Sequence, residues 1–248
     1  MRVAFPGMAV LSVVIAWGIP ATAQQPAVWT PTSNAPVGLL TQLEGQHHDR
    51  FIERAQAGEI DIVFFGTTET EMWLWQDRGR SVWDQAFGTR KAANFGTQGT
   101  RFESLLWRMR NGELDGYQAK VVVLQLPSVG VVLDSADRLA DFVAKEAAIV
   151  AEVRARQPLA RILLFAAFPR GQTDTGPVGR MQEANAALAT LADDKTVFYI
   201  DIGHRFLRPD GSFNQEMWSL DLENRGTQTP VFEVWAQELQ PWLDRFVR

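Results

Sequence analysis

Cysteine is absent from this chain of 248 residues. Its absence excludes disulfide bonds, thiol nucleophiles and zinc sites built from thiolates. Histidine is scarce, because only His47, His48 and His204 occur, so chemistry that needs an imidazole base has three candidates. Without the N-terminal leader described below, roughly 225 residues remain. A domain of this size buries enough apolar surface to fold without disulfides, so the lack of cysteine is compatible with export.

The chain also has no excess of basic residues. Lysine and arginine together number 24 against 29 aspartates and glutamates, which gives a net charge of −5. Proteins that bind duplex nucleic acid neutralise its phosphates with basic patches, so the composition argues against a nucleic-acid partner. Neither a metal-ligand motif nor a phosphate-binding glycine loop occurs, and we predict no cofactor and no metal.

A long hydrophobic run occurs only at the N-terminus. Arg2 is followed by an apolar stretch from Val3 to Pro20 and then by Ala21-Thr22-Ala23, the three parts of a secretory signal peptide cleaved after Ala23. An uncleaved membrane anchor is the alternative, but proline and glycine interrupt the stretch. We therefore expect a signal peptide over 1–23, an extended lead-in over 24–38 and one domain over 39–248. The mature protein would be secreted or periplasmic, without a membrane span.

Apolar runs and amphipathic segments alternate through 39–248. The runs of apolar and β-branched residues predict buried strands at 60–65, 92–95, 121–126, 161–166 and 197–201. Apolar residues at helical spacing predict helices at 39–57, 101–109, 136–156, 180–191 and 231–246. Continuously apolar strands that alternate with helices indicate a parallel sheet covered on both faces. The predicted fold class is therefore α/β, a three-layer α/β/α sandwich.

Several short stretches of this domain resemble one known family. They are Asn94-Phe95-Gly96, Leu106 to Leu114, Phe168-Pro169-Arg170-Gly171, Asp201-Ile202-Gly203 and Trp235 to Leu243. Their order and spacing over about 40–245 resemble the SGNH (GDSL-type) hydrolases, especially the branch related to the platelet-activating-factor acetylhydrolase catalytic subunits. The resemblance implies a flavodoxin-like parallel sheet and hydrolysis of acyl esters by a serine nucleophile.

The resemblance also places the nucleophile. Family members read Gly-Asp-Ser after the first strand, whereas this chain reads Gly66-Thr67-Thr68-Glu69. Thr68 stands at the nucleophile position and Thr67 at that of the aspartate. A threonine hydroxyl can attack a carbonyl, but its methyl group crowds the approach and stiffens the side chain. The alternative role for Thr68 is to cap the helix that follows.

The oxyanion donors of the family are only partly present. One is a glycine N–H in a Gly-x-Gly-Gly-Asp turn, and the resemblance implies that Gly99, after Gln98, keeps this position. A glycine in a turn also has a purely conformational explanation. Another donor is an asparagine side chain, which Val129 replaces. Valine cannot donate a hydrogen bond, and loss of one such donor costs roughly 10²–10³ in turnover.

The family's base, an Asp-x-x-His near the C-terminus, is missing. The region 217–226 contains no histidine. One alignment places the aspartate and histidine on Ser219 and Leu222, and another places them on Glu223 and Gly226.

Other side chains are weaker candidates for the base. His47 and His48 are adjacent on a helix and so do not share a face, which also makes them a poor metal clamp. His204 follows a strand end and could approach the site, although a surface position is the simpler expectation. A carboxylate base has no supporting spacing; the candidates are Glu69, Glu71, Asp221 and Glu223.

Tryptophan is frequent, with nine residues. Trp73 and Trp75 directly follow the Thr68 block and could flank a ligand cleft, although core packing is the alternative role for each. The residues that we predict to line this cleft are Thr67, Glu69, Trp73, Gln98, Arg101 and Val129.

Three functions are consistent with these residues. The first is a secreted protein with the hydrolase fold but without hydrolase activity, which binds a glycan, an acyl ester or a protein partner in the inherited cleft. The second is a working esterase or carbohydrate deacetylase that uses Thr68 and an unrecognised base. A third role is a structural subunit in a homo- or heterodimer with an active relative.

Overall fold

The computed structural model describes residues 38–126, 136–168, 177–217 and 229–247. All of them belong to one compact unit, Pro31–Arg248. The predicted signal peptide and residues 24–37 of the lead-in lie outside the described residues, so both stay predictions. Among the described residues, no helix is long and apolar enough to cross a membrane.

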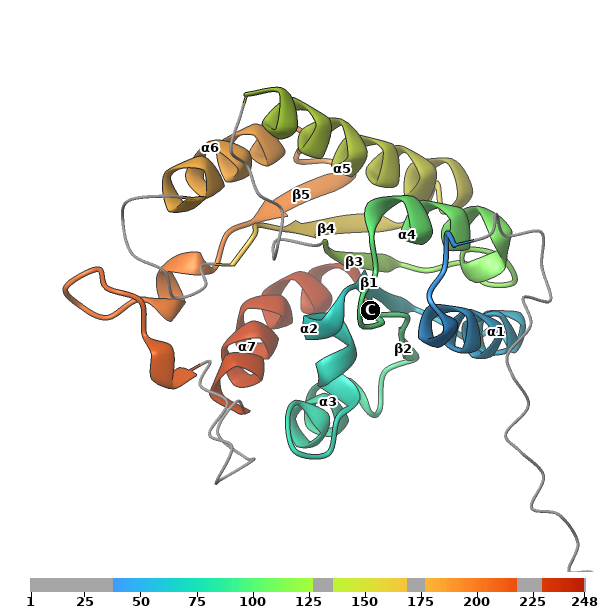
Figure 1. The fold of residues 1–248 in the computed structure, drawn as a ribbon. Helices are drawn as coiled ribbons and strands as arrows, with labels where there is room; N and C mark the ends of the chain where they lie inside the picture. Colours follow the sequence, from blue (N-terminus) through green and yellow to red (C-terminus); the bar gives the residue numbers. More distant parts are fainter. Residues whose placement is uncertain (1–37, 127–135, 169–176, 218–228, 248) are drawn as a thin grey trace, which may run out of the picture. The chain divides into compact units, whose positions relative to one another are not determined.

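Five parallel strands form one sheet in the order β2-β1-β3-β4-β5 (Figure 1). The strands are β1 Ile62–Gly66, β2 Ala92–Asn94, β3 Val121–Gln125, β4 Arg161–Phe165 and β5 Val197–Ile200. Ile62 pairs with Ala92 on one side and with Val121 on the other. This order is the flavodoxin-like one, so the predicted parallel sheet is confirmed. Each strand lies within two residues of its predicted bounds.

Helices cover both faces of the sheet. One face packs against α1 Gln42–Gln56, α4 Phe102–Arg108, α5 Ala136–Arg156 and α6 Pro177–Ala189. The other packs against α3 Arg80–Phe87 and α7 Thr229–Phe246. Alternate strand residues supply the two interiors: Val63 and Phe65 face the first set of helices, and Phe64 faces the second. Figure 1 shows α5 and α6 on one side of the sheet and α3 and α7 on the other.

The five helices predicted from apolar spacing are present. The helix expected directly after Thr68 is α2, Thr68–Glu71, but its N-cap is Thr67, so Thr68 does not cap it. Helix α3 was not predicted. The predicted helix 101–109 is α4, which continues into a π-helical turn over Met109–Glu113. Gly112 in this turn has a φ of +117°, a conformation that glycine adopts readily.

The N-terminus of α1 has a complete capping box. The Thr41 hydroxyl accepts a hydrogen bond from the Glu44 N–H at 3.1 Å, and the Glu44 carboxylate accepts one from the Thr41 N–H at 2.9 Å. These two bonds satisfy donors that the first turn of a helix leaves free. Glu44 is fully buried, and its carboxylate also accepts a hydrogen bond from the Ser104 hydroxyl of α4.

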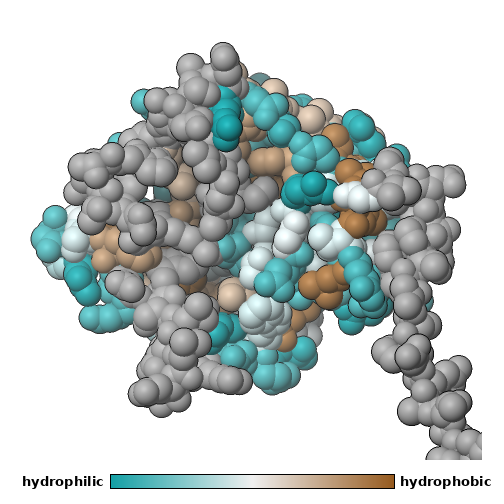
Figure 2. Space-filling view, in the orientation of Figure 1, coloured by the Kyte–Doolittle hydropathy of each residue, from teal (hydrophilic) through white to brown (hydrophobic). Residues whose placement is uncertain are grey.

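Large apolar side chains are scattered over the described surface. The exposed ones are Leu43, Leu74, Leu159 and Leu207. In Figure 2 the hydrophobic residues that are visible lie in small patches between hydrophilic ones. Isolated surface leucines of this kind are ordinary for a folded domain.

Candidate functional site

The predicted site lies where β1 and β2 end. A Cβ on Gly66 would collide with the Thr70 hydroxyl and the Gln125 carbonyl, and a Cβ on Gly96 would lie 2.6 Å from the Glu71 nitrogen. The glycine that ends β1 and the glycine two residues beyond β2 therefore let the backbone of α2 lie directly against the carboxyl edge of the sheet. This edge is where open parallel sheets bind ligands.

Thr68 is the first residue of α2 and is partly exposed. Its hydroxyl makes no hydrogen bond within the described part of the chain, whereas both neighbouring threonines are bonded. The Thr67 hydroxyl donates to Glu69 Oε2 at 2.6 Å, and the Thr70 hydroxyl donates to Gln125 Oε1 at 3.4 Å. No imidazole or carboxylate of the described residues thus makes a hydrogen bond with the hydroxyl at the nucleophile position.

The residues from Gly96 to Gly99 form a turn beside α2, where the Gln98 N–H donates to Glu71. The Asn94 side chain fixes its start, because Asn94 Nδ2 donates to the Thr70 carbonyl at 2.6 Å while Asn94 Oδ1 accepts from the Gly96 N–H at 2.8 Å. Gly99 is exposed, with a φ of +78°, so a glycine is needed there for conformation alone. Its N–H makes no hydrogen bond to any described residue and is free to face a ligand.

His47 contacts this turn, but not at the position of a catalytic base. Its Nδ1 lies 2.7 Å from the Thr97 hydroxyl and 4.0 Å from Glu71 Oε1. Burial, helped by the positive charges of Arg50 and Arg108, lowers the pKa of His47 to about 4. The imidazole is therefore neutral at neutral pH. Thr97 is fully buried, so this histidine–threonine pair cannot attack a substrate.

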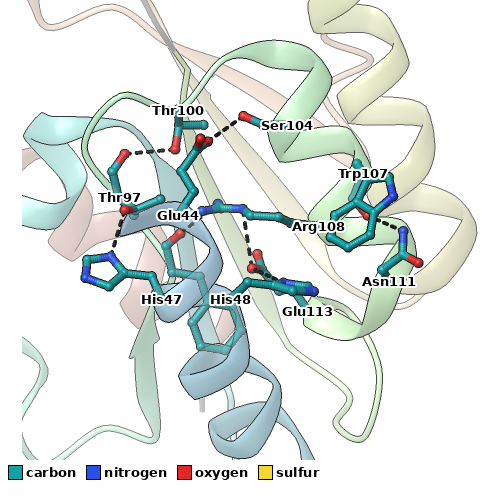
Figure 3. Close-up of polar contacts among 12 residues, drawn as sticks. Glu44, His47, His48, Thr97, Thr100, Ser104, Trp107, Arg108, Asn111 and Glu113 are labelled. Carbon is teal, nitrogen blue, oxygen red and sulfur yellow. Dashed lines mark hydrogen bonds and ion pairs between the residues drawn. The ribbon is translucent and has the colours of Figure 1, made fainter. Parts of the chain in front are cut away.

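His48 points into a different cluster, as expected for the next residue of a helix. Its Nδ1 lies 2.8 Å from Glu113 Oε1, and the same oxygen lies 3.3 Å from Arg108 Nε. Arg108 Nη2 also donates to the Phe95 carbonyl at 3.2 Å. All three ionisable side chains are fully buried between α1 and α4 (Figure 3). This cluster holds the two helices together and does not reach the nucleophile position.

His204 lies on the surface beyond β5. It belongs to the 3₁₀ turn Gly203–Phe206 and is exposed. Two strands, β3 and β4, separate β5 from β1. At about 4.8 Å per strand spacing, β5 is roughly 14 Å from β1, too far for direct proton transfer from Thr68.

The structure corrects one predicted cleft residue. Trp73 is 0 % exposed and packs against Trp235 and Phe232, with ring centroids 5.1 and 4.8 Å away. It belongs to the aromatic core and cannot line a surface cleft, because the 3₁₀ turn Met72–Leu74 directs it inward.

The other predicted cleft residues have varied surroundings. Thr67 and Glu69 are buried and bonded to each other, while Gln98 and Arg101 are exposed. Arg101 Nη2 donates to the carbonyls of Gly38 and Leu39, which ties the end of the lead-in to α4. Val129 lies outside the described residues, as do Ser219, Leu222, Glu223 and Gly226.

Sequence reasoning missed two residues that build the site. Asn94 was noted only as part of a family-like stretch, and Glu71 only as a weak candidate for the base. Both act through contacts with residues more than twenty positions away, which no local pattern reveals. Among the described residues, no group of three or more acidic or histidine side chains is placed to hold a metal ion.

Comparison with known proteins identifies the family. The model of the GDSL-like lipase/acylhydrolase family matches residues 63–226, from β1 to the region of the missing base. The chain belongs to this family. It is similar to the platelet-activating factor acetylhydrolase IB subunit alpha1 of Homo sapiens, with 29 % identity over 187 residues that cover 74 % of this chain and 77 % of that protein. The alpha1 subunit of Pongo abelii is 30 % identical over 169 residues, which cover 67 % and 69 %.

Solved structures of GDSL-like proteins share the fold of this chain. A GDSL-like lipase from Bacteroides thetaiotaomicron superposes with a TM-score of 0.61 at 14 % identity, covering 80 % of this chain and 97 % of that one. At this identity the likeness supports the fold and not the activity. The predicted SGNH hydrolase fold is thereby confirmed.

Proposed function

We propose that this chain is an exported SGNH-fold protein that has lost ester hydrolysis and binds a ligand at the carboxyl edge of the sheet. The main support is the Thr68 hydroxyl, which has no hydrogen-bond partner among the described residues. A hydroxyl nucleophile needs an adjacent base, because it is weak at its ordinary pKa. The ligand would be a glycan, an acyl ester or a protein partner.

The size of the loss favours a protein without useful hydrolase activity. Removing a nucleophile or its base in a serine hydrolase costs about 10⁶ in turnover, equivalent to roughly 8 kcal/mol of barrier. An oxyanion site and substrate binding alone leave about 10³–10⁴ over the uncatalysed rate. The absence of a histidine from 217–226 in the sequence agrees with this argument.

Assay of residues 24–248 tests the proposal directly. Short acyl-nitrophenyl esters and acetylated sugars are suitable substrates, with the Thr68→Ala variant as the matched control. We expect the wild-type chain and the variant to hydrolyse both substrate classes at the rate of buffer. Turnover by the wild-type chain that Thr68→Ala abolishes would overturn the proposal.

The alternative is an esterase or carbohydrate deacetylase that uses Thr68. One observation favours it: the Gly99 N–H is unbonded within the described part of the chain and could stabilise an oxyanion. The relatives are named as acetylhydrolases, so an acetyl ester is the first substrate to test. Replacing Thr68 by serine should then raise turnover, because serine lacks the crowding methyl group.

Export and assembly are separate parts of the proposal. N-terminal sequencing of the protein from cell fractions should give Gln24 as the first residue, and a retained Met1 would contradict cleavage. Size-exclusion chromatography with light scattering tests the role as a dimer subunit. A monomer without a co-purifying partner would count against that role.

A further inference from the structure

Glu71 links three parts of the chain at the candidate site. It is the last residue of α2, and its side chain is 16 % exposed. Its Oε2 accepts a hydrogen bond from the Gln98 N–H at 2.5 Å, and the Trp75 indole donates to the same carboxylate. Its Oε1 lies 4.0 Å from Nδ1 of His47 in α1.

Side chains hold the turn next to Glu71 at three points, one of which is the contact between the His47 imidazole and the Thr97 hydroxyl. The Asn94 side chain fixes its start at Gly96, and the Glu71 carboxylate fixes it at Gln98. The Thr100 hydroxyl closes the turn by donating to the Thr97 carbonyl at 2.8 Å. Between these bonds lies Gly99, whose N–H is unbonded in the described part of the chain and whose Cβ position faces open space.

We propose that Glu71 is a positioning residue for the ligand site: its carboxylate fixes the backbone at Gln98 and so determines where the Gly99 N–H is presented. Hydrogen bonds from a neutral N–H to a charged group are about twice as strong as neutral ones, which suits a bond that must hold an exposed turn. The effect on a ligand rests on the proposed function, whereas the effect on the turn does not.

The hydrogen bond between the Gln98 N–H and the Glu71 carboxylate can be followed through the titration of Glu71. Burial raises the pKa of Glu71 above its ordinary value, and the hydrogen bonds from Gln98 and Trp75 and the charges of Arg50 and Arg108 only partly oppose this rise. The Gln98 amide proton donates directly to the titrating group, so its chemical shift should report the ionisation of Glu71. His47 is the other titrating group near the carboxylate, with a pKa lowered to about 4.

Amide NMR of residues 24–248 across acidic pH tests the assignment. The Gln98 amide should titrate with a midpoint above 4.5, the ordinary value for a glutamate. Glu71→Gln keeps an acceptor without a charge, so the titration should vanish while the Gln98 and Gly99 shifts stay close to those of the wild type. In Glu71→Ala the exchange of the Gln98 amide should be about ten- to a hundredfold faster.

Two further variants separate this role from general support of the fold. His47→Gln removes the second titration and should leave the Gln98 midpoint in place. Trp75→Phe removes one donor to Glu71, so the midpoint should rise. A Gln98 amide that does not titrate, or that exchanges equally fast in wild type and in a folded Glu71→Ala, would overturn the assignment. If Glu71→Ala does not fold, the comparison of Glu71→Gln with the wild type decides.

Binding then tests the link to the ligand. Acetylated and unmodified oligosaccharides are the probes, and Glu71→Ala should weaken binding about tenfold or more while Glu71→Gln retains it. Probes that fail to bind the wild-type chain would count against the proposed function, but they leave the amide measurement intact. Binding that is unchanged in Glu71→Ala would contradict the positioning role itself.

Discussion

On the side of the sheet covered by α1, α4, α5 and α6, several ionisable side chains are fully buried, whereas the side covered by α3 and α7 is filled with aromatic rings. The buried ionisable residues are Glu44, His48, Arg108, Glu113 and Glu146. The aromatic side contains Phe64, Trp73, Trp83, Phe87, Phe232 and Trp235. Stability should therefore depend on ion pairing and pH on one side and on packing alone on the other.

The difference matters for the candidate site, because α2 lies where both sides meet. Trp73, directly after α2, belongs to the aromatic core, while Glu71 within α2 contacts His47 on the polar side. The aromatic core therefore supports α2 on the side of α3 and α7, and hydrogen bonds support the site on the side of α1. Substitutions on the two sides should therefore differ in how the loss of stability depends on pH.

The largest expected effect is on the aromatic side. Replacing Trp73 by alanine should lower the free energy of unfolding by about 3–5 kcal/mol, because it empties a fully enclosed ring position. The loss, measured by urea denaturation, should be the same at acidic and neutral pH. The neighbouring exposed Leu74 gives the control, since Leu74→Ala should change stability little. A strongly pH-dependent loss of stability in Trp73→Ala would contradict the view that packing alone stabilises this side.

On the side of the sheet with buried ionisable residues, Glu113→Ala should lower the free energy of unfolding by a comparable amount. The change leaves Arg108 as a buried charge without its carboxylate partner, and breaking such a pair costs about 3–5 kcal/mol. Urea denaturation measures the loss, with Glu53→Ala on the exposed face of α1 as the control. A cost below that of Glu53→Ala would show that the cluster is not an ion pair.

His47 should make stability sensitive to acid. Its pKa in the folded chain is about 4, below the ordinary 6.5, so the unfolded chain binds more protons between these values. The contribution is present above pH 6.5 and is lost as the pH falls through the folded value. In His47→Gln this part of the acid sensitivity should disappear, by about 1–3 kcal/mol in the denaturation curves. Identical pH profiles for variant and wild type would contradict it.

Glu146 should affect the pH dependence of stability in the opposite direction to His47, and its effect should be the smallest of the four. It is buried on α5 without a charged partner among the described residues, and burial raises its pKa well above 4.5. The folded chain then holds a proton that the unfolded chain releases, so stability decreases as the pH rises above 4.5. Glu146→Leu should raise the free energy of unfolding by about 1 kcal/mol at neutral pH. Glu146→Gln should remove only the pH dependence, and an unchanged slope would rule out this role.

Much of the fold could be predicted from the sequence because its signals are local. Five apolar runs marked the strands, and periodic apolar residues marked the long helices. The helix α3 was missed, since its conformation depends on packing against α7. Trp73 was placed near a cleft because it follows Thr68 in sequence, but the turn after α2 directs it into the core.

The candidate site was only half predictable. Alignment with the family placed Thr68 and Gly99, and the sequence alone excluded a cysteine nucleophile and a C-terminal histidine base. The roles of Asn94 and Glu71 could not be predicted, because their hydrogen bonds join residues 24 and 27 positions apart. Such contacts exist only after the strands have been brought side by side.

The sequence by itself determined the parallel α/β sheet, the place of Thr68 at the end of its first strand, and the absence of a histidine from 217–226. Periodicity, composition and the glycine after β1 are sufficient for these, since each acts over a few neighbouring residues. Only the tertiary structure decided that the Thr68 hydroxyl stays unpaired in the described part of the chain while those of Thr67 and Thr70 are bonded. The physical reason is that a hydrogen bond needs its partner within about 3 Å, and folding alone supplies that partner.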